Sequence, residues 1–184
     1  MDILTGAGLA APAGLNAYIP LLTVGLLDRF TGLIELDSPY DILSSDAGLI
    51  VLTILLVVEL FADAIPGLDS VNDLVQTLIR PAAGAFVMFA ADGGALDLHP
   101  ILQALIGGGL AALVHTVKAL GRPIITVTTA GIGNAGVSSA ENALALVLSL
   151  LAILVPVFVL VVIAVLFVLA IRWLLHRRGG RARA

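Results

Sequence analysis

The sequence contains no cysteine, and few of its 184 residues carry a charge. The absence of cysteine excludes disulfide bonds, thiol nucleophiles and thiolate metal sites, although it identifies no compartment. Only 12% of the residues are charged, whereas soluble domains have about a quarter. Because 60% are hydrophobic and the mean hydropathy is +1.13, the composition predicts one all-α membrane domain over residues 1–184, with a basic cytoplasmic tail at 177–184.

The first apolar run, residues 3–27, lacks the preceding basic segment of a cleaved signal peptide, so we interpret it as a retained membrane span. Pro12 and Pro20 each remove a backbone donor within this run, which predicts a bent or broken helix. Asn16 and Tyr18 then lie near freed carbonyl groups. These two residues either line a site or stabilise a packing kink.

Ionisable residues within the next two predicted spans are candidate functional residues, since charge is costly in hydrocarbon. Glu59 and Asp63 are four residues apart, so they share one helical face. Glu59 lies deeper, whereas Asp63 is interpreted as a boundary residue that is solvated or bonded to Arg80. We predict that Arg80 forms an ion pair with Glu59 or Asp73 rather than binding an anion.

The fourth predicted span carries His115 and Lys118 three residues apart on one face. His115 either relays protons or bonds a single partner. The sequence has no second histidine at metal-ligand spacing, so no metal site or cofactor is expected. Lys118 and Arg122 are interpreted as markers of the cytoplasmic end of this span.

A polar stretch rich in glycine, T-V-T-T-A-G-I-G-N-A-G-V-S-S-A-E-N at 126–142, lies between two strongly apolar runs. Polar backbone beside hydrocarbon is tolerated only where protein buries it or where it lines a cavity. We therefore predict a re-entrant or broken segment that lines a vestibule. Ser138 or Ser139 is expected to cap the last helix, with Glu141 in its first turn. The other candidate ligands within residues 126–142 are Thr128, Thr129 and Asn134.

Charge distribution predicts six crossings with both termini in the cytoplasm, because the loops at 28–46 and 92–99 are acidic and the tail is basic. With this topology, the ionisable residues of the spans fall in the cytoplasmic half of the membrane. We therefore predict that the vestibule opens to the cytoplasm. A weak echo between residues 6–11 and 107–112 suggests inverted halves at 1–92 and 99–176. The predicted helices are 3–27, 47–65, 71–91, 100–120, and 143–175 as one long helix or two pieces that meet near Pro156.

Four motifs carry a family resemblance: G-L-A-A-P-A-G-L-N-A-Y-I-P-L, D-A-I-P-G-L-D, R-P-A-A-G and T-T-A-G-I-G-N-A-G-V-S-S-A-E-N. Together they resemble a family of small bacterial polytopic membrane proteins that is catalogued only as a domain of unknown function. The resemblance extends over nearly the whole chain. It implies a multi-pass protein of the bacterial cytoplasmic (inner) membrane, and it supplies no activity, substrate or site residue.

The pattern favours a small transporter or channel for an ion or small polar solute, in which intramembrane carboxylates bind or titrate. The alternative is an accessory or assembly subunit of a membrane complex. A lipid-modifying enzyme ranks last, because no zinc spacing or nucleophile elbow is present and no catalytic residue is expected. Expected partners are the lipid bilayer, an unidentified solute or ion, and a second copy in a homo-oligomer, but no nucleic acid. The candidate binding residues are Asn16, Tyr18, Glu59, Asp63, Arg80, His115, Lys118, Thr128, Thr129, Asn134, Ser138 and Glu141.

Overall fold

A computed structural model describes residues 3–65, 68–92, 98–156, 161–169 and 171–172. The described chain is all-α, as predicted, and residues 161–169 are also helical. Six α-helices and one short 3-10 helix have defined bounds: α1 (Ile3–Ala13), α2 (Tyr18–Thr31), η1 (Tyr40–Ser44), α3 (Asp46–Ala64), α4 (Leu68–Asp92), α5 (Pro100–Thr129) and α6 (Gly133–Leu154).

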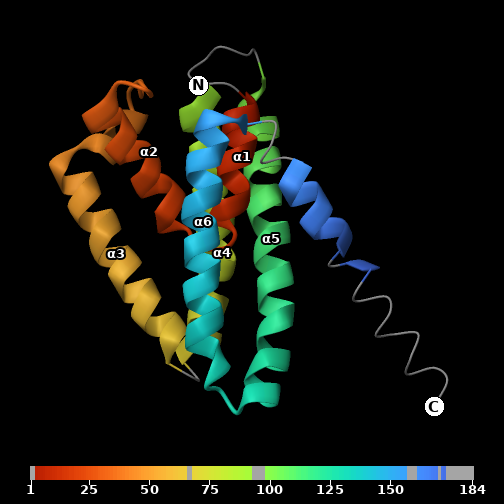
Figure 1. The fold of residues 1–184 in the computed structure, drawn as a ribbon. Helices are drawn as coiled ribbons and strands as arrows, with labels where there is room; N and C mark the ends of the chain where they lie inside the picture. Colours follow the sequence, from red (N-terminus) through yellow and green to blue (C-terminus); the bar gives the residue numbers. More distant parts are fainter. Residues whose placement is uncertain (1–2, 66–67, 93–97, 157–160, 170, 173–184) are drawn as a thin grey trace.

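The first apolar run is broken, as predicted, but it does not cross the bundle. In Figure 1, α1 runs from the N-terminal end to the middle of the bundle, and α2 returns toward the same end. At a rise of 1.5 Å per residue, the 11 residues of α1 reach only about half of a 30 Å hydrocarbon core. Asn16 stabilises the break, because its Oδ1 accepts hydrogen bonds from the backbone N–H groups of Tyr18 (3.0 Å) and Ile19 (3.1 Å).

Three described helical segments are long and apolar enough to cross a membrane: Val71–Ala91, Pro100–Thr129 and Gly133–Leu154. Helix α3, with 19 residues, lies alongside them and also extends along the bundle (Figure 1). The predicted helices at 47–65 and 71–91 are therefore confirmed as helices. These lengths suit a multi-pass membrane protein.

The segment at 126–142 is broken, as predicted, but only by a short turn, and the described residues show no re-entrant segment there. Helix α5 continues to Thr129, a short turn follows, and α6 begins at Gly133. The hydroxyl groups of Thr126 and Thr128 donate to carbonyl oxygens four residues back, which satisfies them within the helix. The turn is made by Ala130 (φ 51°) and Gly131 (φ 85°), both left-handed. Ser138 and Ser139 consequently lie inside α6 and do not cap it.

The hairpin of α1 and α2 also changes the predicted topology. The start of α1 and the connection between α2 and α3 lie at one end of the bundle, and the α5–α6 turn lies at the other (Figure 1). The start of α1 and the acidic 28–46 segment therefore lie at the same end of the bundle, whereas the predicted topology separates them. The described residues show neither six crossings nor an inverted repeat, because residues 6–11 belong to a half-length helix and residues 107–112 to the middle of α5.

The C-terminal apolar run, left open as one helix or two, is divided in the structure. Helix α6 ends at Leu154, and residues 161–169 form a separate described helical segment. In Figure 1 this segment turns back beside α5.

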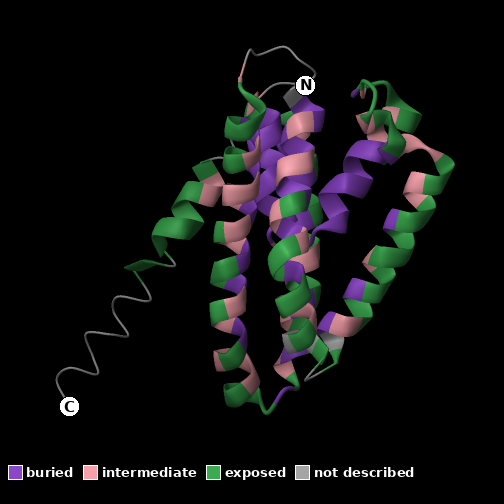
Figure 2. Ribbon diagram, turned by 180° about the vertical axis from the view of Figure 1, so that it is seen from behind, coloured by how far each residue is buried: buried purple, intermediate pink, exposed green. Residues whose placement is uncertain are grey.

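Helix α1 forms the centre of the bundle, packed against α4, α5 and α6. Figure 2 shows buried residues concentrated on α1 and the first part of α2, whereas the outer helices expose much of their surface. The central break at Asn16 is thus buried completely, and its polar groups need partners from the surrounding helices.

Single cysteines added to this cysteine-free chain test the hairpin. One cysteine precedes the first residue, one replaces Glu35 and one replaces Ile132. We expect a membrane-impermeant maleimide to label the first two from the same side of the membrane and Ile132→Cys from the other, since α1 and α2 together return to their starting end. Labelling of the N-terminal cysteine from the Ile132 side would contradict the hairpin and restore a single crossing over residues 3–27.

Candidate functional site

A buried ion pair links α3 to α4. Arg80 Nη2 lies 2.9 Å from Glu59 Oε1, and both side chains are at most 1% exposed. A second guanidinium nitrogen, Nη1, lies 3.5 Å from Asp73 Oδ1, two turns earlier on α4. The predicted pairing of Arg80 with Glu59 or Asp73 is confirmed, because Arg80 contacts both carboxylates.

His115 joins this pair from α5, and its partners fix its tautomer. Arg80 Nη1 lies 2.7 Å from His115 Nδ1, and since a guanidinium only donates, Nδ1 must accept. On the other side, Nε2 lies 3.1 Å from the Thr77 hydroxyl oxygen, whose hydrogen is donated to the Asp73 carbonyl. Nε2 therefore carries the ring hydrogen, and His115 is neutral in this arrangement.

Asp63 is the centre of a second group of charges one turn further along α3. Its Oδ2 lies 2.9 Å from Lys118 Nζ and 3.1 Å from Arg122 Nη2, and its Oδ1 accepts from Asn72 Nδ2 at 2.8 Å. The interpretation of Asp63 as a boundary residue that is solvated or bonded to Arg80 is wrong, because its side chain is fully buried and its partners come from α4 and α5.

Helix α6 completes this second group with Glu141 and Ser138. Glu141 Oε2 lies 2.8 Å from Arg122 Nη2 and 3.2 Å from Lys118 Nζ. The Ser138 hydroxyl accepts from Arg122 Nη2 at 2.8 Å and donates to the Asp63 carbonyl at 3.1 Å. Lys118 and Arg122 are therefore buried ion-pair residues, and their use as markers of the cytoplasmic side stays a prediction.

The break between α1 and α2 contacts the same group of charges. Lys118 Nζ donates to the carbonyl oxygen of Leu15 at 2.9 Å, just beyond the C-terminal end of α1, where a cation is favoured. Asn16 Nδ2 donates to Asn142 Oδ1 on α6 at 3.0 Å. A discontinuous helix thus meets ionised side chains near the middle of the bundle, an arrangement that transporters use for ion sites.

The two groups of ionised side chains lie within electrostatic reach of each other, and we call them together the charge network. Among the described residues it has more carboxylates than cations: Glu59, Asp63, Asp73 and Glu141 against Arg80, Lys118 and Arg122, with neutral His115 beside Arg80. With these carboxylates ionised, the described part of the network carries one surplus negative charge, which lies in the group of Glu59, Asp73 and Arg80. Binding of one proton or one monovalent cation would neutralise it.

Glu59 Oε2 and Arg80 Nε are buried atoms of the charge network that have no hydrogen-bond partner among the described residues. Gln76 Oε1 is buried nearby and also has no hydrogen-bond partner among them. Buried polar atoms normally have partners, so each unsatisfied atom requires an explanation such as a bound water or ion. Glu59 Oε2 is therefore an available acceptor in a fully buried ion pair.

Most of the candidate residues come together. Glu59, Asp63 and Arg80 are at most 1% exposed, so this part of the network is closed among the described residues, whereas the Glu141 side chain is 16% exposed. The candidates within the network or at its edge are Asn16, Glu59, Asp63, Arg80, His115, Lys118, Ser138 and Glu141.

Tyr18 is buried in the first turn of α2, where it hydrogen-bonds Gln76 and lies within electrostatic reach of Glu59 and Arg80, so it also belongs to the edge of the network. Three candidates have other places. Thr128 and Thr129 are exposed, and their hydroxyl groups bond within α5. Asn134 Nδ2 donates to the Thr126 hydroxyl at 2.9 Å and so ties the two helices together beside their turn.

Sequence reasoning did not include Asp73, Arg122 and Asn142 among the binding candidates. One signal was available for Arg122, because His115, Lys118 and Arg122 have spacings of three and four residues, which place them on one helical face. No described group of three or more histidine and acidic side chains is arranged to hold a metal ion.

Comparison with protein families gives one description that covers nearly the whole chain. The model of the domain of unknown function DUF4126 matches residues 3–176. No curated protein and no solved structure matches the chain. The arrangement of the charge network is consequently the direct evidence on function.

Proposed function

The chain belongs to the DUF4126 family, and from this starting point we propose that it is a small membrane transporter or channel in which the charge network binds one proton or small monovalent cation. The observation that carries the proposal is the unpartnered, fully buried Oε2 of Glu59 beside a network with one surplus carboxylate.

The membrane setting supports this function because it limits what a buried charge can do. Ionisable groups within spans are costly, and they mark ion or proton pathways by default. Here they come from three helices long enough to cross a bilayer and from α3 beside them. A purely structural network would be expected to balance its charges and to satisfy each buried oxygen.

The break between α1 and α2 supplies the second argument. A half-length helix ends at the centre of the bundle, so its last carbonyl groups have no hydrogen-bond partner within the helix and are available there to other groups. The Leu15 carbonyl already takes a hydrogen bond from Lys118, and Asn16 connects the break to α6. Movement of the hairpin of α1 and α2 would therefore change the partners of Lys118, and with them the affinity of the network for a cation.

Purified protein in liposomes tests the proposal. We expect wild-type protein to dissipate an imposed proton, sodium or potassium gradient faster than protein-free liposomes. Glu59→Gln keeps an oxygen for Arg80 but removes the surplus charge, so the flux should fall roughly tenfold or more, equivalent to about 1.4 kcal/mol of lost cation binding. Glu35→Gln, a change of an exposed carboxylate in the α2–α3 connection, is the matched control and should leave the flux unchanged.

Two outcomes would contradict the proposal. The first is equal flux in the wild type, Glu59→Gln and Glu141→Gln. The second is no flux from well-folded protein together with co-purification of a stoichiometric membrane complex, which would favour the alternative of an accessory subunit.

A further inference from the structure

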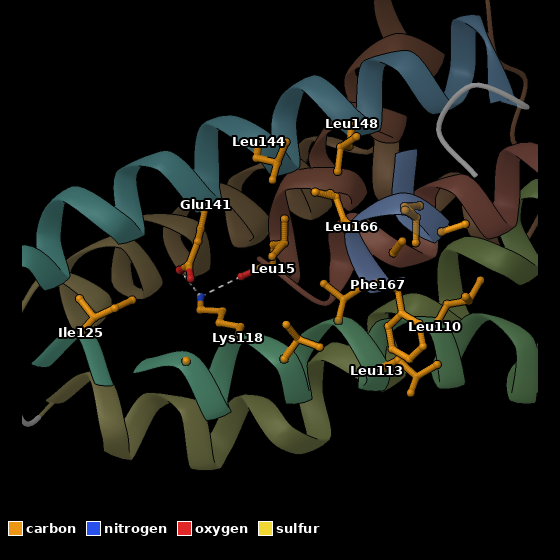
Figure 3. Close-up of a pocket in the computed structure, with 16 residues that line it drawn as sticks. Leu15, Leu110, Leu113, Lys118, Ile125, Glu141, Leu144, Leu148, Leu166 and Phe167 are labelled. Atoms are coloured by element: carbon orange, nitrogen blue, oxygen red, sulfur yellow. Dashed lines mark hydrogen bonds and ion pairs between the residues drawn. The ribbon is translucent and has the colours of Figure 1, made fainter. Parts of the chain in front are cut away.

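A separate apolar cavity of about 550 Å³ lies between α1, α5, α6 and the helical residues 161–169 (Figure 3). This size is within the range of sites for small molecules. Leucine, isoleucine, valine and phenylalanine side chains make up most of its wall, including Leu110, Leu113, Leu148, Leu166 and Phe167. The length of α5 from Leu110 to Lys118 is about 12 Å, since eight residues rise 1.5 Å each.

One part of the wall is charged. Lys118 and Glu141 line the cavity, and Figure 3 shows the lysine Nζ between the Glu141 carboxylate and the Leu15 carbonyl. Lys118 has three ammonium hydrogens, and it has three acceptors, at Asp63 (2.9 Å), Leu15 (2.9 Å) and Glu141 (3.2 Å). Its donor capacity is therefore used within the protein, and an anionic group in the cavity would gain little from it.

Glu141 has capacity left. Its contacts with Arg122 and Lys118 both use Oε2, while a carboxylate has two oxygens that accept hydrogen bonds. A cavity with an apolar wall and a carboxylate at one side is complementary to a molecule with one hydrocarbon chain and a cationic, hydrogen-bond-donating head.

We propose that this cavity binds a single-chain cationic amphiphile of the alkylamine class, with its ammonium head at Glu141 and its chain along Leu113, Leu148 and Phe167. The inference concerns binding alone and holds whether or not the protein transports a cation. A phospholipid with an anionic phosphate fits the site less well, because its head would face the Glu141 carboxylate.

Gly121 offers a way to fill the cavity without disturbing the fold. It lines the cavity on α5, and a Cβ built on it would meet no heavy atom within 4 Å. The leucine side chain of Gly121→Leu would therefore occupy the part of the cavity that the alkylamine chain would fill. Gly109 provides the matched control, since it lies on the same helix, has equally open surroundings and does not line the cavity. Both substitutions replace a helix glycine by a better helix former.

Equilibrium binding of radiolabelled dodecylamine to protein in phosphatidylcholine nanodiscs tests the proposal, with empty nanodiscs as the measure of lipid partitioning. We expect saturable binding at one site per chain in the wild type and in Gly109→Leu, and a loss of at least roughly tenfold in Gly121→Leu. Glu141→Gln should weaken dodecylamine binding by about tenfold, because a charge-assisted hydrogen bond becomes a neutral one, while dodecanol binding stays unchanged.

Competition in the wild type gives a test that requires no variant. Dodecylamine should displace the label best, dodecanol less well and dodecanoate least. The proposal is overturned if dodecanoate competes best, if Gly121→Leu binds as tightly as Gly109→Leu, or if binding does not exceed partitioning into empty nanodiscs.

Discussion

Replacing Arg80 by methionine is expected to destabilise the protein by about 3–5 kcal/mol, the usual cost of removing one partner from a buried ion pair. Arg80 is fully buried, and its guanidinium group contacts Glu59, Asp73 and His115. Methionine has a similar length and can fill the space. The decrease in the free energy of unfolding therefore reports the removal of the charge and not a loss of packing. The measurement is the free energy of unfolding in detergent micelles, obtained from a denaturant titration.

A second substitution separates loss of the pair from loss of one charge. In Glu59→Leu/Arg80→Met, one charge of each sign is removed, so no carboxylate remains unpaired at position 59, and Asp73, which also loses Arg80, is 12% exposed to solvent. Apolar replacements of a buried pair are often neutral, and we expect the double variant to recover most of the lost stability. The difference between the double variant and the sum of the single variants gives the coupling energy of the pair.

The exposed pair between Arg29 and Asp46 is the matched control. Their nitrogen and oxygen atoms are 2.6 Å apart, but the two side chains are 36% and 82% exposed. Solvent screens such pairs, so Arg29→Met should change the free energy of unfolding by less than about 1 kcal/mol. Equal losses in Arg29→Met and Arg80→Met would show that the buried pair has no special role in stability.

The double variant also connects stability with the proposed function. It should fold, yet it lacks the Glu59 carboxylate, so the transport proposal predicts that its flux stays as low as that of Glu59→Gln. Recovery of both stability and flux would place the cation site at another carboxylate of the charge network.

The positions of the helices and of the main ion pair were predictable from the sequence because each rests on a single strong rule. Apolar runs of about 20 residues form spans, which gave the helices at 47–65 and 71–91. A buried arginine requires a carboxylate, which gave the contact between Arg80 and Glu59.

The errors arise where two structures satisfy the same rule. Residues 3–27 have the length of a span, and only tertiary packing decides that the break at Asn16 reverses the chain. The threonines of 126–142 satisfy their hydroxyl groups within α5, so their polarity does not require an irregular backbone. Arg122 has the same charge whether it faces cytoplasm or Asp63, and charge counting cannot distinguish these environments.

The close contact between α4 and α5 is the second feature on which the arrangement of the charge network depends, since these helices carry Arg80 and His115. A Cβ built on Gly84 would lie 2.5 Å from the Gly107 carbonyl oxygen, and a Cβ on Gly107 would collide with the Gly84 carbonyl oxygen in return. Both obstacles are backbone atoms, which cannot move aside as a flexible side chain can. Small residues at this position therefore allow the two helices to approach.

Gly107→Ala is expected to destabilise the protein by about 1–3 kcal/mol, because the added methyl group overpacks this contact. Gly109→Ala, two residues further along α5, should instead be stabilising by about 0.5–1 kcal/mol, since its Cβ meets no heavy atom within 4 Å and alanine is the better helix former. The two variants should thus differ by about 1.5–4 kcal/mol in the free energy of unfolding. Because separation of α4 from α5 also moves Arg80 away from His115, Gly107→Ala should reduce the cation flux while Gly109→Ala preserves it. Equal stability of the two variants would mean that α4 and α5 do not approach each other as the structure places them.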